Sequence, residues 1–254
     1  MNSYNKQALD IIAKEHGFIR DNLEKVMRLV EILNYFHDSP LLSKSLVLKG
    51  GTAINLTVFQ LPRLSVDIDL DFTVDCDRES MLSIRQEVLS DVKVRSLSPV
   101  ELFATKINAL IGRSAARDIY DVYKMVVHQL FRSDEERTLL RKATVFYLTV
   151  GSSRKDNATP TEYTDFPQID KIRFPQIRSQ LLPVLRRSEH FDFEKAKIEV
   201  EEFLSQLLVL TDSEKEYVRE FNDKKYIPEL LFEDKEIVDR IKFHPMALWK
   251  TRSR

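Results

Sequence analysis

Residues 46–72, LVLKGGTAINLTVFQLPRLSVDIDLDF, combine a pair of glycines with a strictly alternating run of apolar and acidic side chains. From Leu64 onward, apolar side chains at every second position alternate with Asp67, Asp69 and Asp71. A period of two is the period of a β-strand, whose successive side chains point to opposite faces. We therefore predict a buried strand over residues 64–74 with an apolar face and a face of aspartates.

Ionised carboxylates on one strand face repel each other and are costly to bury unless a cation lies between them. Asp67 and Asp69 are two residues apart, so their Cα atoms are about 6–7 Å apart in a strand and their oxygens can converge on a pair of Mg²⁺ ions. Two such ions would hold a triphosphate and activate an attacking hydroxyl. A solvent-facing acidic strand or a Ca²⁺ site in a loop would give the same pattern.

Gly50 and Gly51 stand together in a chain that has only five glycines. They end the β-rich run SLVLK and open the short helical segment TAINLTVF. At such a point backbone N–H groups can face an anion without a side chain in the way, and Thr52 adds a hydroxyl. A tight turn between two elements would explain the glycines equally well. Beside a D-x-D strand, however, the pair predicts a nucleotide site.

Helical periodicity flanks this region on both sides. Ser98, Pro99 and Glu101 form a helix-start signal of N-cap, first-turn proline and capping-box acid. We predict helices over residues 9–16, 18–39, 77–90, 98–113 and 114–131, a short strand over 91–97, and amphipathic helices from about 133 onward, with a polar loop at 151–167. The fold class is α+β, with a small mixed β-sheet domain and its flanking helices over residues 1–130 and a mostly helical domain over 131–254.

Composition limits the partners and the compartment. Lys and Arg number 39 against 40 Asp and Glu, so no overall field attracts nucleic acid or an anionic membrane, and any polyanion must be held locally. The lone Cys76 excludes an internal disulfide. With no secretory h-region and no apolar run of about 20 residues, we expect a cytoplasmic protein without a membrane partner.

Four segments, LKGGTAINL, RLSVDIDLDF, ELFATKINALIGR and RDIYDVYKM, occur in this order. Together they resemble the AbiEii family of nucleotidyltransferases, toxins of type IV toxin–antitoxin and abortive-infection systems. The resemblance covers about residues 45–130 and implies a DNA-polymerase-β-like nucleotidyltransferase core followed by helices. It also implies a toxin that uses Mg²⁺ or Mn²⁺ to transfer a nucleoside monophosphate from an NTP to an acceptor, the acceptor end of tRNA, and a cognate antitoxin as a partner.

The resemblance also assigns roles to residues of the four segments. As catalytic residues it implies Asp67, Asp69, Lys106 and Asp121, of which Asp67 and Asp69 are the metal ligands. As nucleotide-binding residues it implies Gly50, Gly51, Ser65, Lys106 and Asp118, and we add Thr52 for its hydroxyl beside the glycines. Without the resemblance, Lys106 could equally be a surface lysine with a buried stem, and Asp118 and Asp121 part of a surface ion-pair ladder with Lys124.

One feature departs from the family pattern. Only residues 73–98 separate the D-x-D strand from the lysine helix, and no strand there carries a clear central acid. Asp71 is then the candidate for the third metal carboxylate. The alternatives are a catalytically impaired nucleotide-binding or interaction protein of the same fold, and a nucleotidyltransferase that modifies small molecules.

Overall fold

The computed structural model describes residues 5–59, 61–72, 96–151 and 158–252. The chain forms two compact units: residues 1–102 with 174–191, and residues 103–173 with 192–254. Residues 174–191 therefore belong to the first unit although the flanking chain belongs to the second. The predicted domains, divided at residue 130, rest on the change from mixed to helical sequence patterns. They do not coincide with these two units and stay a prediction.

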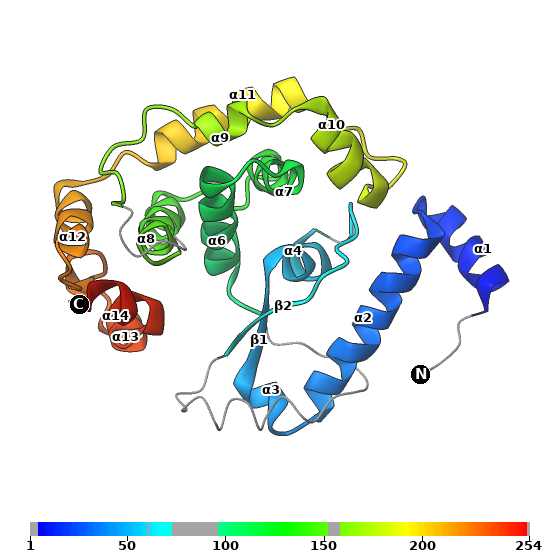
Figure 1. Ribbon diagram of the computed structural model, residues 1–254, viewed down its shortest axis with the longest axis horizontal. Helices are drawn as coiled ribbons and strands as arrows, with labels where there is room; N and C mark the ends of the chain where they lie inside the picture. The colour runs from blue at the N-terminus through cyan, green and yellow to red at the C-terminus, as the bar shows by residue number, and fades with distance from the viewer. Residues whose placement is uncertain (1–4, 60, 73–95, 152–157, 253–254) are drawn as a thin grey trace. The chain divides into compact units, whose positions relative to one another are not determined.

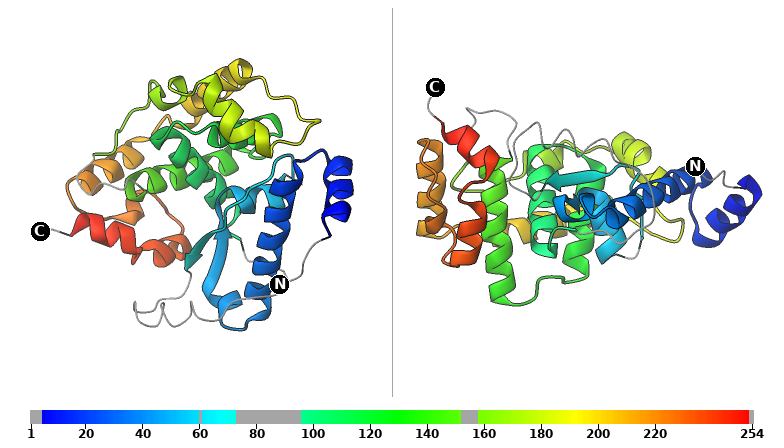
Figure 2. Two further views of the ribbon diagram at one scale, coloured as in Figure 1. Left: turned by 45° about the vertical axis from the view of Figure 1, so that its right-hand side comes forward. Right: turned by 90° about the horizontal axis from the view of Figure 1, so that it is seen from below.

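The first unit combines short helices with a small sheet. In Figures 1 and 2, helix α2 and strand β1 run in opposite directions and are joined by α3. The elements of the unit are α1 (Lys6–His16), α2 (Arg20–Asp38), α3 (Leu42–Ser45), β1 (Leu46–Lys49), α4 (Gly50–Ala53), the π-helical turn η1 (Ile54–Val58), β2 (Asp69–Phe72), α10 (Phe174–Gln176), the π-helical turn η2 (Ile177–Leu181) and the 3-10 turn η3 (Leu182–Val184). The two helices predicted before residue 40 are confirmed, as are the short strand before the glycines and the short helix after them.

Strands β1 and β2 pair antiparallel, with Lys49 opposite Asp69 and Val47 opposite Asp71. A parallel bridge joins Leu48 to Ser96, and the Leu97 N–H donates to the Leu48 carbonyl over 3.0 Å. Antiparallel and parallel pairing thus both occur at β1. The α+β class with a small mixed sheet is confirmed.

The predicted strand over residues 64–74 is too long at its beginning, because β2 starts only at Asp69. The residues just before it pair with a different segment: the Leu64 N–H donates to the Val184 carbonyl over 2.7 Å. Leu64 is fully buried in an apolar cluster with Phe18, Val26 and Val184. This pairing replaces a continuation of the β1–β2 ladder. Residues 73–95 lie outside the described residues, and with them the predicted helix over 77–90, most of the predicted strand over 91–97, and Cys76.

Helix α6 (Pro99–Gly112) begins in the first unit and continues in the second. Its start is the predicted capping box: the Glu101 N–H donates to Ser98 Oγ over 3.3 Å, and the Ser98 N–H donates to Glu101 Oε2 over 3.2 Å. Because both donors would otherwise lack a partner at the helix start, this box sets where α6 begins. The start of α6 in turn places Lys106 along the helix.

In its described part, the second unit consists of helices and the loops that join them. Figure 2 shows α12 and α14 beside α8, and α7 packs on α11. Besides the rest of α6, the elements are α7 (Ala116–Val127), α8 (Asp134–Val150), α9 (Pro167–Asp170), α11 (Phe193–Leu207), α12 (Asp212–Asn222), the 3-10 turn η4 (Pro228–Leu230), α13 (Lys235–Ile241) and α14 (Pro245–Thr251). The predicted helices after residue 98 are confirmed. None of the helices in the described ranges has the length and apolar character needed to cross a membrane.

Candidate active site

The glycine turn lies against the aspartate strand. Gly50 has a φ of +71°, a conformation that side chains other than glycine rarely adopt. A Cβ atom placed on Gly50 would lie 2.8 Å from Asp69 Cγ and 3.0 Å from Asp69 Cβ. Glycine is therefore required here for two reasons, the backbone conformation and the close approach of a predicted metal ligand.

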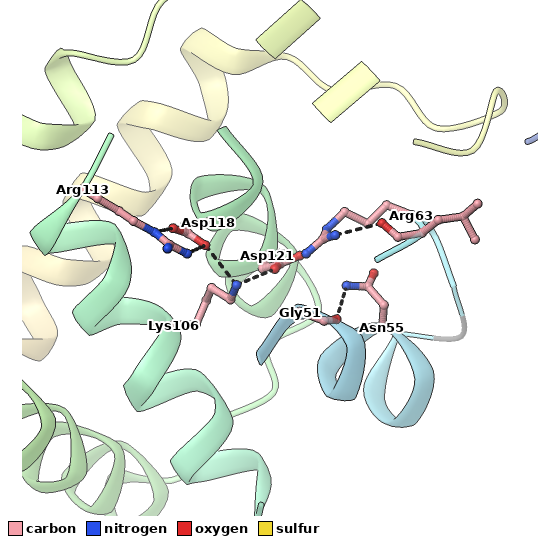
Figure 3. A network of polar contacts seen from close by, with 8 residues as sticks. Gly51, Asn55, Arg63, Lys106, Arg113, Asp118 and Asp121 are labelled. Atoms are coloured by element: carbon pink, nitrogen blue, oxygen red, sulfur yellow. Dashed lines mark hydrogen bonds and ion pairs between the residues drawn. The ribbon is translucent and has the colours of Figure 1, made fainter. Parts of the chain in front are cut away.

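Gly51 is enclosed by other side chains of the same unit. A Cβ atom on Gly51 would lie 2.8 Å from Arg63 Nη2 and 3.1 Å from Ser65 Oγ. The Gly51 carbonyl accepts a hydrogen bond from Asn55 Nδ2 over 2.8 Å, and Figure 3 shows this bond with Arg63 close by. Asp69 thus lies against Gly50, and Arg63 lies against Gly51.

Thr52 and Ser65 are both buried. The Thr52 hydroxyl donates to the backbone carbonyl of Asp67, so its proton is already used to hold the turn to the chain that carries the D-x-D pair. The structure therefore brings the predicted residues Gly50, Gly51, Thr52, Ser65, Asp67 and Asp69 together in one place. Direct nucleotide contact by Thr52 and Ser65 stays a prediction.

The prediction that the aspartate face is buried is wrong. Asp67 and Asp69 are exposed, and Asp71 is half-buried. Exposed carboxylates keep their hydration, so no cation is needed to make them tolerable. Exposure instead leaves them accessible to an ion from solvent, and carboxylate oxygens are the ligands that Mg²⁺ takes.

Asp71 has a partner within the small sheet. Its Oδ1 atom lies 2.9 Å from Lys49 Nζ, on the facing strand. In the described ranges, no group of three or more His, Cys, Asp or Glu side chains is arranged to hold a metal ion. The roles of Asp67 and Asp69 as metal ligands, and of Asp71 as a third ligand, stay predictions.

The second unit carries a buried cluster of charges. Lys106 on α6 lies between two carboxylates of α7: its Nζ is 3.0 Å from Asp118 Oδ1 and 3.2 Å from Asp121 Oδ2 (Figure 3). Lys106 is 7% exposed, Asp118 1% and Asp121 0%. Lys106 is therefore not a surface lysine, and Asp118 and Asp121 are not part of a surface ladder.

Arg113, the residue after α6, completes this cluster. Its Nε donates to Asp118 Oδ2 over 2.7 Å, and its Nη2 donates to Asp118 Oδ1 over 3.2 Å. Burial by itself raises the pKa of Asp118, but the charge of Lys106 and the hydrogen bonds from Arg113 outweigh burial and hold this pKa below its ordinary value. Asp118 is thus ionised at neutral pH and can hold Lys106 in place.

Arg63, which belongs to the segment RLSVDIDLDF, lies behind the glycine turn together with Asn55. Sequence reasoning missed two residues around these groups: Asn55 and Lys49, which pairs with Asp71. The period of β2 and the antiparallel pairing of β1 could have suggested the last pair, because diagonal positions on two strands lie within reach of long side chains. No local signal indicates that Arg63 is buried.

The described elements form an α+β fold with a small sheet. The family model described as "Nucleotidyl transferase AbiEii toxin, Type IV TA system" matches residues 35–93 and 82–224. The chain belongs to this AbiEii family of nucleotidyltransferase toxins.

The solved structure of MenT4, nucleotidyltransferase toxin Rv2826c from Mycobacterium tuberculosis H37Rv, is similar to this chain with a TM-score of 0.60. Sequence identity is 14%, and the match covers 99% of this chain and 100% of that one. At this identity the likeness supports the fold. A search among curated proteins finds no match for the chain.

Proposed function

We propose that this protein is a toxin that transfers a nucleoside monophosphate from an NTP to the acceptor end of tRNA. Membership of the AbiEii family supports the reaction class. The observation that carries the proposal is the contact between Gly50 and Asp69. It sets a turn with side-chain-free backbone directly beside a predicted metal ligand, as a site for a metal-bound triphosphate requires.

The residues of the first unit would bind the nucleotide. The first N–H groups of a helix lack partners within the helix, so Gly50 and Gly51 at the start of α4 would supply donors for phosphate oxygens. Asp67 and Asp69 would hold Mg²⁺ or Mn²⁺. When bound, such an ion neutralises triphosphate charge and favours the deprotonated form of the attacking hydroxyl.

The charged residues of the second unit would stabilise the pyrophosphate leaving group. In this proposal Lys106 offsets the negative charge that develops as pyrophosphate leaves, a role that an oriented ammonium in a low-dielectric environment performs well. Asp121 and Asp118 orient Lys106 through the two buried ion pairs. Because Asp118 is almost fully buried, its contribution to nucleotide binding would be made through Lys106 and Arg113.

We propose the tRNA acceptor and the antitoxin partner because the family belongs to toxin–antitoxin systems. Modification of a tRNA end would stop translation and so inhibit growth. The family description refers to a toxin–antitoxin system, and we therefore propose that a cognate antitoxin counteracts this protein.

The experiment that tests the proposal is incubation of the protein with each radiolabelled NTP, Mg²⁺ and total tRNA, followed by a denaturing gel. We expect label on tRNA with at least one NTP, loss of label with a chelator, and its return when Mg²⁺ or Mn²⁺ is added back. Asp67→Ala and Lys106→Ala should abolish transfer. Asp223→Ala, which changes an exposed aspartate of the helical unit, is the matched control and should retain it.

Three results would contradict parts of the proposal. Nucleotide transfer by Asp67→Ala or Lys106→Ala would contradict the catalytic role assigned to that residue. Label on a small molecule but not on tRNA would change the acceptor class. NTP binding by the unmodified protein without any transfer would favour the catalytically impaired nucleotide-binding protein.

A further inference from the structure

Arg63 is a charged side chain in an unusual position. It is 1% exposed and is the largest fully buried side chain among the described residues. Burying a guanidinium is costly unless its N–H groups find partners, and Nη1 donates to the Leu64 carbonyl over 3.0 Å. The other terminal nitrogen, Nη2, lies 2.8 Å from the point where a Cβ of Gly51 would be. The guanidinium therefore occupies the space that a side chain at position 51 would take.

The backbone of Arg63 is held by residues 183–187, which we name the return segment. Arg63 and Leu185 form an antiparallel bridge, flanked by a hydrogen bond from the Leu64 N–H to the Val184 carbonyl (2.7 Å) and one from the Arg186 N–H to the Pro62 carbonyl (3.0 Å). Arg63 is thus fixed on both sides by backbone hydrogen bonds.

The return segment is itself attached to the N-terminal helices. The Arg187 N–H donates to the Gly17 carbonyl over 2.7 Å, and Asn22 Nδ2 donates to the Pro183 carbonyl over 2.6 Å. Val184 packs into the cluster with Phe18. These contacts fix the backbone at Arg63, while burial and the hydrogen bond from Nη1 to the Leu64 carbonyl hold its guanidinium.

We propose that Arg63 is a positioning residue for the nucleotide, acting through Gly51. Its guanidinium supports the turn from behind, while Asn55 fixes the Gly51 carbonyl. Together they hold the backbone N–H groups where the triphosphate binds. This inference rests on the proposed function, because it assigns Arg63 to the same nucleotide site.

Substitution of Arg63 separates positioning from folding. Lysine keeps the charge but lacks the planar fork, so Arg63→Lys removes the support beside Gly51, and Arg63→Met also removes the charge. A displaced turn weakens binding of the triphosphate. Misplacement of a substrate group by about 1 Å can lower kcat/KM by up to about 10²-fold. We expect the KM for NTP to rise about tenfold or more in both variants, with kcat changed less than about threefold. A purely structural role would instead reduce the folded fraction, lowering kcat and leaving KM unchanged.

The experiment measures KM and kcat for the NTP at saturating tRNA, and the Kd for the same NTP by calorimetry, well below the melting temperature of each variant. Arg187→Met, an exposed arginine of the return segment, is the matched control and should keep the original KM. Gly51→Ala should raise KM strongly in the unmodified protein but less in an Arg63→Ala background, because the guanidinium that meets the new Cβ is then gone.

The outcomes distinguish the two proposals. Unchanged KM and Kd in Arg63→Lys and Arg63→Met would overturn the role of Arg63 while transfer by the unmodified protein upholds the proposed function. Additive effects of Gly51→Ala and Arg63→Ala would likewise overturn it. If the unmodified protein binds no NTP, the proposed function fails and the role of Arg63 falls with it.

Discussion

Replacing Gly50 with alanine tests the geometry of the glycine turn most directly. Alanine at a φ of +71° costs about 1 kcal/mol of backbone strain. The new Cβ would lie 2.8 Å from Asp69 Cγ and 3.0 Å from Asp69 Cβ, so the Asp69 side chain must rotate or the strand must shift. Such over-packing costs about 1–3 kcal/mol. The free energy of unfolding of Gly50→Ala should therefore fall by about 2–4 kcal/mol.

Urea unfolding followed by circular dichroism measures this difference, with Gly112→Ala as the matched control. A Cβ on Gly112 meets no atom within 4 Å, so that variant should be unchanged or more stable by up to about 1 kcal/mol. A double-mutant cycle then isolates the contact. In an Asp69→Gly background the collision is absent, and Gly50→Ala should cost only the strain of about 1 kcal/mol.

Two results would refute this reasoning. An unfolding midpoint of Gly50→Ala equal to that of the unmodified protein would mean that neither strain nor collision exists. Equal costs of Gly50→Ala with and without Asp69 would mean that the two residues do not touch, and the observation on which the proposed function rests would be lost.

Three further predictions concern buried charges of the second unit. Lys106→Met leaves two buried carboxylates without their shared cation and should destabilise the protein by about 3 kcal/mol in urea unfolding; a loss under about 1 kcal/mol would contradict this. The pKa of Asp118 is lowered in the folded state, so this carboxylate stabilises the fold above its unfolded-state pKa of about 4, and the stabilisation is lost on further acidification. The free energy of unfolding of Asp118→Asn should therefore fall less between pH 7 and pH 3 than that of the unmodified protein. Burial lowers the pKa of Lys250 to about 8, so between pH 8 and about 10.5 the folded state binds fewer protons than the unfolded state. The contribution of Lys250 to the free energy of unfolding should therefore rise with pH in this range. Thermal melts of Lys250→Met should lack this rise.

The elements that the sequence predicted well depend on neighbouring residues. The capping box of Ser98 and Glu101, the end of α1 at Gly17 and the glycine turn at Gly50 are all local events, in which the deciding hydrogen bond or φ angle involves residues at most a few positions apart. Such signals can be read directly from the order of residues. The clustering of the predicted residues from Gly50 to Asp69 was equally accessible, because all of them lie in one short stretch of chain.

The errors concern pairing and burial. The alternation from Leu64 onward is a strand pattern, yet residues 64–68 lie outside the β1–β2 ladder because Leu64 pairs with Val184, far along the chain. The same pattern is compatible with buried and with solvent-facing aspartates, and Asp67 and Asp69 are exposed. A period of two shows which residues share a face, but whether that face is covered depends on elements that the period does not describe.

Motifs and local periodicity are enough to predict the family, the α+β class and the residues of the glycine turn and the D-x-D pair. The position of Lys106 between Asp118 and Asp121, and the burial of Arg63 behind Gly51, are visible only in the folded chain. A charged side chain is stable in the interior only where partners meet it. Those partners come from other turns, helices and strands, so the burial of Lys106 and Arg63 is a property of the assembled fold.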